Sequence, residues 1–260
     1  MLTSSHAITR TGLDAVALKP TECNVRRALE LPLDTVTIDY EGREHLPDEE
    51  TLAELAAETT LRLTVPVRAD GFDPLGDDSL FDRLPDEAGQ VLVAGHPAYL
   101  SDREKSRAIA PRLGAALERT SDAWVGTEGV KRIATATGAT QFELLSRSTD
   151  RELRALRAAG FEGTIAVYAP TALTDEEDTI LDAVGEYVSR RNPVARALPD
   201  GAKADARATG RARDVLSAAS RDFALVGSED EVGERVSELK DAGADVVVGY
   251  PARGIDPFLG

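Results

Sequence analysis

The chain has 260 residues, enough for one large domain or two small ones with a sizeable buried core. It carries 46 acidic and 30 basic residues, a formal net charge of −16, and such a surface repels nucleic acid and is expected to act as a solvated shell. The single cysteine, Cys23, excludes an internal disulfide and a metal site built from cysteines alone.

Only five of the 30 basic residues are lysines. Sparse lysine with abundant Asp, Glu and Thr is typical of proteins from salt-loving organisms, and we predict a haloarchaeal source. High internal salt would shorten the Debye length to a few Å, on the order of 3 Å at molar concentration, and remove most of the repulsion among surface carboxylates. Residues 1–10 lack the apolar core of a signal peptide, and no stretch approaches the length of a membrane span. We therefore expect a soluble, cytoplasmic protein that acts on a small molecule and has no nucleic-acid or membrane partner.

An alternation of apolar strands and amphipathic helices runs from residue 14 to residue 191. Strands are predicted at residues 14–19, 35–40, 62–70, 90–96, 123–128, 141–147 and 164–170. Helices are predicted at residues 21–31, 48–59, 102–119, 130–137, 150–159 and 174–191, and residues 71–89 are predicted to form a loop. An added helix at residues 203–220 precedes a short apolar segment at residues 223–227.

The last unit, residues 226–251, carries the clearest signals in the chain. Ser228 and Glu231 have the spacing of a capping box, which predicts a helix that begins near Glu229. Val232, Val236 and Leu239 form one apolar stripe on that helix, and a glycine ends it at residue 243. Three consecutive valines at residues 246–248 then predict a strand buried on both faces, as in a parallel sheet.

Eight strands separated by helices predict an α/β fold of the (β/α)8 TIM-barrel type, as a single domain over residues 1–260 with an extra helical segment between strands 7 and 8. A doubly wound open sheet is the alternative. The barrel is favoured by the count of eight and by polar residues that recur on one face of the second and third strands. No helix follows the last strand, so an apolar seam should remain between the last and first strands. We predict that the helix at residues 203–220 or a second subunit, in a homodimer, covers it.

In such a barrel the active site lies at the carboxyl ends of the strands. The candidate residues share a position at or just after such an end: Lys19, Asp39, Arg68, Asp70, His96, Glu128, Arg147, Tyr168, Tyr250 and Arg253. Asp39 shares its strand face with Thr35 and Thr37, and Arg68 shares its face with Thr64, so both are expected to point into the barrel.

Each candidate also has a structural interpretation. Lys19 is either a desolvated amine for Schiff-base chemistry or anion binding, or the ion-pair partner of Asp39. His96 is either a proton-transfer group or bonded to a loop carbonyl. Glu128 and Arg147 are either a general base and an anion clamp, or partners of each other.

Phosphate binding in barrels of this type uses the loops after strands 7 and 8, here predicted at residues 169–174 and 249–254. Arg253 would supply a charge there, unless it lies on a flexible tail. Tyr168 and Tyr250 suit stacking on a cofactor ring, although aromatic residues are also ordinary barrel packing. No spacing of His, Asp and Glu has the form of a metal-binding helix, so no metal site is predicted.

The last unit, VGSEDEVGERVSELKDAGADVVVGYP at residues 226–251, resembles the C-terminal helix and last strand of the luciferase-like barrels that depend on a flavin or on the deazaflavin F420. That resemblance implies FMN or F420 at the barrel mouth, with its ring near Arg68, Asp70, His96 and Tyr168, and the segment at residues 203–220 would be the family's extra helices. The chain departs from the family after the fourth strand, where GHPAYL at residues 95–100 replaces a loop with Gly and Trp.

Three functions are consistent with these features. The first is a luciferase-like oxidoreductase or monooxygenase that uses FMN or F420 on a small organic substrate. The second is a cofactor-free lyase or isomerase on an anionic metabolite, with Lys19 or His96 transferring the proton and an arginine as anion clamp. The third is a barrel that has lost catalysis. A mouth whose charges are all paired with one another would favour the third.

Overall fold

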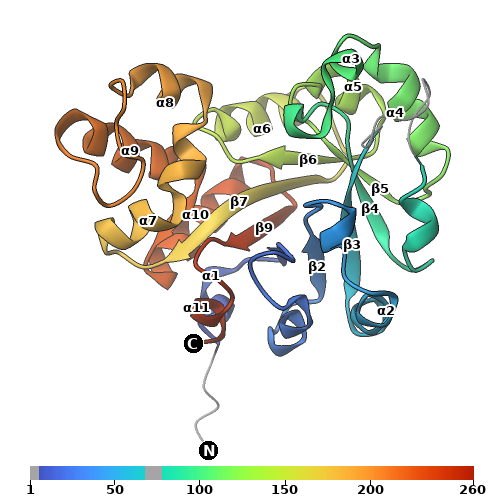
Figure 1. Ribbon diagram of the computed structural model, residues 1–260, viewed down its shortest axis with the longest axis horizontal. Helices are drawn as coiled ribbons and strands as arrows, with labels where there is room; N and C mark the ends of the chain where they lie inside the picture. Colours follow the sequence, from blue (N-terminus) through green and yellow to red (C-terminus); the bar gives the residue numbers. More distant parts are fainter. Residues whose placement is uncertain (1–5, 68–77) are drawn as a thin grey trace, which may run out of the picture.

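The computed structural model describes residues 6–67 and 78–260, and its strands form a closed parallel barrel (Figure 1). The barrel strands follow the order of the chain, and the last pairs with the first through Ala15 and Val248. Their bounds are β1 (Ala15–Leu18), β2 (Thr35–Ile38), β3 (Thr60–Pro66), β4 (Gly89–Val93), β5 (Ala123–Gly126), β6 (Thr140–Leu144), β7 (Ile165–Leu173) and β9 (Val246–Pro251). The strand β8 (Leu225–Gly227) pairs with the end of β7 and lies outside the ring. The predicted (β/α)8 barrel is thus confirmed.

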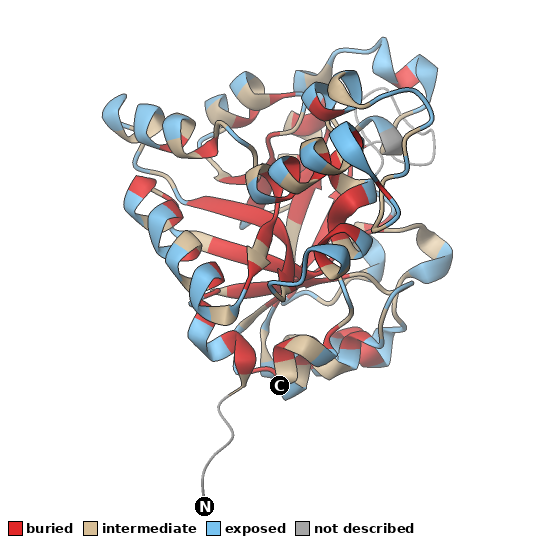
Figure 2. Ribbon diagram, turned by 90° about the vertical axis from the view of Figure 1, so that its left-hand side faces the viewer, coloured by how far each residue is buried: buried red, intermediate tan, exposed pale blue. Residues whose placement is uncertain are grey.

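Helices lie between the strands and cover the outside of the barrel. They are α2 (Glu49–Glu58), α3 (Asp102–Lys105), α4 (Ile109–Leu117), α5 (Lys131–Ala136), α6 (Thr149–Ala158), α7 (Glu177–Ser189) and α10 (Glu229–Ala242). In Figure 2 their outward surfaces are exposed and the strands are buried. Within the described residues, no helix is both long enough and apolar enough to cross a membrane.

Two predicted helices differ from those observed. The segment at residues 21–31 forms the short 3-10 helix η1 (Val25–Glu30), where the Asn24 side chain accepts a hydrogen bond from the Arg26 amide at 3.1 Å. The helix predicted at residues 102–119 is split into α3 and α4. Pro111 has no amide hydrogen, and its ring would clash with the carbonyl of Arg107 in a continuous helix. A new helix therefore begins at Ile109.

The last unit forms as its sequence predicts. The Glu231 carboxylate accepts hydrogen bonds from the Ser228 amide and hydroxyl, both at 2.8 Å, and the Ser228 hydroxyl accepts from the Glu231 amide. This capping box starts α10 at Glu229. The stripe of Val232, Val236 and Leu239 is buried against the barrel.

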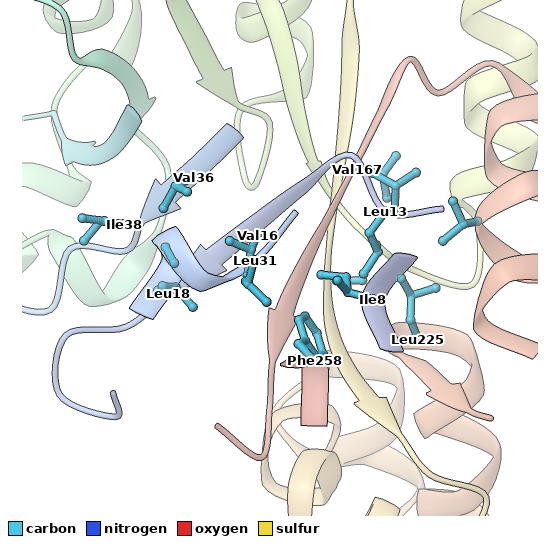
Figure 3. Packing of buried hydrophobic residues seen from close by; sticks show 14 of the residues in the cluster. Ile8, Leu13, Val16, Leu18, Leu31, Val36, Ile38, Val167, Leu225 and Phe258 are labelled. Atoms are coloured by element: carbon cyan, nitrogen blue, oxygen red, sulfur yellow. The ribbon is translucent and has the colours of Figure 1, made fainter. Parts of the chain in front are cut away.

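The inserted segment before β8 does not cover the seam, so this half of the prediction is wrong, and the second subunit given as its alternative stays a prediction. Its helices α8 (Asn192–Ala197) and α9 (Gly210–Phe223) pack on α7, where Leu181, Val194 and Leu216 share one apolar cluster. The seam is closed by the short terminal helices α1 (Ala7–Thr11) and α11 (Asp256–Leu259), whose Ile8 and Phe258 are buried in the main cluster (Figure 3).

The inner face of the barrel has an aromatic half and a polar half. Rings from β5, β6, β7 and β9 form a continuous row, with neighbouring centroids 5.6 to 6.3 Å apart: Trp124, Phe142, Tyr168 and Tyr250. The inward positions of β2 and β3 carry polar groups instead, and Thr37, Arg62 and Thr64 are buried there. The next inward position of β2 belongs to Asp39, which therefore faces the aromatic row.

Candidate functional site

The carboxyl group of Asp39 lies at the mouth of the barrel, between the polar and aromatic halves. One oxygen accepts a hydrogen bond from the Tyr168 hydroxyl at 3.0 Å, and the other accepts from the Thr64 hydroxyl at 3.2 Å. Burial raises the pKa of Asp39 from 3.8 to about 6, although the Lys19 charge and both hydrogen bonds oppose this rise. Asp39 is therefore an acid that is present in both protonation states near neutral pH.

Two buried tyrosines stack on each other beside this carboxyl. The rings of Tyr168 and Tyr250 are nearly parallel, at 7° and with centroids 6.3 Å apart. Burial raises the pKa of Tyr168 well above its ordinary value, and the Asp39 charge adds to the shift, so its hydroxyl stays a donor. Burial and a hydrogen bond donated to Glu22 likewise raise the pKa of Tyr250.

Lys19 does not form the ion pair with Asp39 that the sequence suggested as an alternative. Its ammonium group lies 4.0 Å from the ring centroid of Tyr250 and 3.4 Å from a carboxylate oxygen of Glu22. A cation over an aromatic face is held by the ring quadrupole. Among the described residues, no cation lies within ion-pair distance of Asp39.

His96 and Glu128 meet where the loops after β4 and β5 approach each other. A Cβ atom at position 95 would lie 2.2 Å from the carbonyl oxygen of Glu128, so Gly95 permits this approach. The His96 ring lies 3.5 Å from one Glu128 oxygen, and Arg191 lies 3.4 Å from the other. The predicted pairing of Glu128 with Arg147 is wrong, because Glu128 is shared between His96 and Arg191.

The remaining predicted residues are either exposed or outside the described residues. Arg147 and Arg253 are both exposed, and the part of the chain that the structure describes offers neither of them an ion pair. Arg68 and Asp70 lie outside the described residues. Residues 169–173 do not form the predicted loop, because β7 continues to Leu173 and pairs with β8 and β9; phosphate binding there stays a prediction.

A cleft of about 640 Å³ opens at the ends of β5 and β6, next to the mouth. Glu128 and Leu144 line it, and Leu144 also packs against the interior cluster that contains Tyr168. The lining comes from the loops after the two strands, from α5 and α6, and from the inserted segment: residues 127–133, residues 143–146, Ser148, Glu152, Arg191 and Phe223.

The acidic groups in this cleft are largely neutralised by one lysine. Lys131 is 2.7 Å from Glu143 and also pairs with Glu152. Burial lowers the pKa of Lys131, but the hydrogen bonds to Glu143 and Glu152 outweigh it and raise the pKa overall. Glu143 also accepts from the Thr127 hydroxyl at 2.6 Å. Over residues 6–67 and 78–260, no group of three or more His, Cys, Asp or Glu side chains is arranged to hold a metal ion.

A family model described as "Family of unknown function (DUF7388)" matches residues 8–258. The chain belongs to this family. No curated protein matches the chain. Among solved structures, 34 chains match the DUF7388 protein, including an F420-dependent secondary alcohol dehydrogenase in complex with an F420-acetone adduct. That structure shares 9% sequence identity with a TM-score of 0.55, over 92% of this chain and 94% of its own. The likeness shows that the two chains share the barrel fold.

Two parts of this site in the DUF7388 chain were missed in the sequence. Arg191 is 63 residues from Glu128 and comes from the inserted segment, and an arginine after a helix is ordinarily a capping residue. Thr64 was recognised as inward-facing, but its bond to Asp39 depends on the register of β2 and β3. No local signal in the sequence gives either contact.

Proposed function

We propose that this protein is an oxidoreductase that binds the deazaflavin F420 at the barrel mouth and oxidises or reduces a small organic substrate beside Asp39. The observation that carries the proposal is the Asp39 carboxyl, which has a pKa of about 6 and no direct counterion among the described residues. The shared barrel of an F420-dependent alcohol dehydrogenase supports the choice of cofactor class.

The interconversion of an alcohol and a carbonyl needs a proton as well as a hydride. F420 supplies or accepts the hydride when it is bound. The alcohol hydroxyl must then lose a proton, or the carbonyl oxygen must gain one, and Asp39 is suited to both directions because its pKa is near the working pH. Tyr168 donates to the Asp39 carboxylate and so holds it in one orientation.

The residues at the mouth fit a flat ring. The stacked rings of Tyr168 and Tyr250 provide aromatic surface at the mouth, and the adjoining cleft of about 640 Å³ lies within the range of small-molecule sites. Tyr168 and Tyr250 would contact the ring of the cofactor, and the cleft would take the rest of the cofactor or the substrate. FMN has a ring of similar shape and is the alternative cofactor.

The proton-transfer chemistry of Asp39 would also serve a cofactor-free isomerase or lyase. The test is F420 reduction with a panel of small primary and secondary alcohols, in high salt, followed by the loss of the cofactor's visible absorbance. We expect turnover with at least one alcohol, and Asp39→Asn should lower kcat by about 10²-fold to 10⁴-fold. Asp86→Asn, at an exposed acid in the turn before β4 and so at the opposite end of the barrel, is the matched control.

An unchanged kcat in Asp39→Asn, with F420 still reduced, would remove Asp39 from the reaction. Failure to reduce F420 or FMN with every alcohol would reject the oxidoreductase. Conversion of a substrate without either cofactor, still dependent on Asp39, would identify the isomerase or lyase instead.

A further inference from the structure

Arg191 lies in the wall of the cleft as a largely buried guanidinium with few partners. Its side chain is 19% exposed, and it stacks on the ring of Tyr187 with 4.2 Å between the guanidinium carbon and the ring centroid. A guanidinium has five N–H donors. Glu128 accepts from it at 3.4 Å, which is longer than the 2.7 to 2.9 Å or so of a strong charge-assisted bond, and the Tyr187 hydroxyl is its other close polar neighbour.

Two buried polar atoms beside this contact have no hydrogen-bond partner within the described part of the chain. They are Nε of Arg191 and the hydroxyl oxygen of Tyr187. An unpaired buried donor is costly, because it has given up water without gaining an acceptor. Arg191, in the wall of the cleft, thus has more hydrogen-bond donors than the described residues satisfy.

The charged side chains that line the cleft are compatible with a bound anion. Of its three acids, Glu143 and Glu152 are bound to Lys131, and Glu128 is divided between His96 and Arg191. Arg132, on the rim, is exposed and has no ion pair with any residue that the structure describes. The chain has a net charge of −16. In this cleft the cationic side chains equal the acids in number, so an anion is repelled less there than at the acidic surface.

We infer that Arg191 is an oxyanion-binding residue, which holds a carboxylate or phosphate group of a ligand in this cleft by displacing Glu128. The planar fork of Arg191 matches either group, and Tyr187 is a positioning residue because its ring fixes the plane of the fork. When Arg191 releases Glu128, the carboxylate keeps its other partner, His96. Anion binding by Arg191 does not depend on the proposed function. The identity of the molecule that carries the oxyanion, either substrate or cofactor, rests on the proposed function.

Calorimetric titration of the purified chain with inorganic phosphate and, separately, with succinate tests the site at constant ionic strength. We expect saturable binding of at least one anion. Arg191→Gln should weaken it at least tenfold, and Arg211→Gln, at an exposed arginine of α9 outside the cleft, should leave it unchanged. Glu128→Gln should tighten binding severalfold, because it removes the competing carboxylate. Tyr187→Leu should weaken binding, whereas Tyr187→Phe keeps the ring and should bind within about threefold of wild type.

Wild-type affinity in Arg191→Gln, or the absence of binding of both anions, would overturn the inference. If Arg191→Gln does not fold, Glu128→Gln decides: an affinity equal to that of the wild type would also overturn it. If phosphate competes with F420, the oxyanion belongs to the cofactor, and if it competes with the organic substrate alone, the oxyanion belongs to the substrate. Anion binding without F420 binding would reject the proposed function alone, and F420-dependent turnover without anion binding at Arg191 would reject this inference alone.

Discussion

The raised pKa of Asp39 makes a quantitative prediction about stability. The Asp39 carboxyl has a pKa of about 6 in the folded protein and an ordinary value of 3.8. Deprotonation of Asp39 is therefore less favourable in the folded protein than in the unfolded chain. The difference between these values corresponds to about 3 kcal/mol, at 1.36 kcal/mol for each pKa unit. This stabilising contribution is fully present below pH 3.8 and is lost as the pH rises through about 6.

Asp39→Asn removes that titration and leaves the other carboxylates in place. Tyr168 and Thr64 donate to the two different oxygens of Asp39, and the asparagine side chain has only one oxygen that can accept. The loss of one hydrogen bond should lower the stability by about 1 kcal/mol at every pH. On top of this loss, the stability of the variant relative to the wild type should improve by about 2 kcal/mol between about pH 4.5 and about pH 7.5, as the linkage relation gives for these two pKa values.

Urea denaturation of both proteins at several pH values, with Asp86→Asn as control, measures this difference. The slope with pH is the decisive quantity, because most other effects of the substitution do not change with pH. A difference between Asp39→Asn and the wild type that stays constant over this range would refute the raised pKa, and with it the assignment of Asp39 as the proton-transfer group.

Four further predictions concern the fold. Ser228→Ala should destabilise the protein by about 1 kcal/mol, because it removes the N-cap of α10; an unchanged urea midpoint would contradict this. Phe258→Ala should cost about 3 to 5 kcal/mol if α11 closes the seam, and a cost near that of a surface substitution would show that it does not. Arg235→Gln breaks two contacts to Asp150 at 2.9 and 2.7 Å, which hold the pKa of Asp150 below its ordinary 3.8. Its penalty should be present at neutral pH and disappear as the pH falls below 3.8, and a penalty that persists there would exclude the ion pair as its cause. Raising KCl from about 0.1 M to about 2 M should raise the melting temperature, because screening reduces repulsion among the surface acids; a decrease would argue against adaptation to salt.

The barrel could be predicted because its signals are local and repeated. Each strand is a short apolar run, and the helix caps have defined spacings, as at Ser228 and Glu231. Pro111 also carried a local signal for the break between α3 and α4. The seam could not be predicted, because α11 has four residues and α1 has five, which is too short for a helical period to be visible.

The candidate site was predictable only in part. The alternation of β2 indicated that Asp39 faces inward, and its hydrogen bond from Tyr168, 129 residues away, agrees with that orientation. Its role in cofactor binding stays a prediction, as do the roles of His96, Glu128, Lys19 and Tyr250. The partners of Glu128 depend on how the inserted segment packs against the barrel, and strand periodicity carries no information on that packing.

The central claim is that this barrel mouth binds F420. The most direct test is a fluorescence and absorbance titration of the purified protein with F420 in high salt, with FMN as a parallel titrant. The account predicts saturable binding of F420 at one site per chain, weakened when Tyr168 and Tyr250 are both replaced by leucine. The absence of any spectral change with F420, at concentrations well above the dissociation constants typical of cofactor sites, would contradict it.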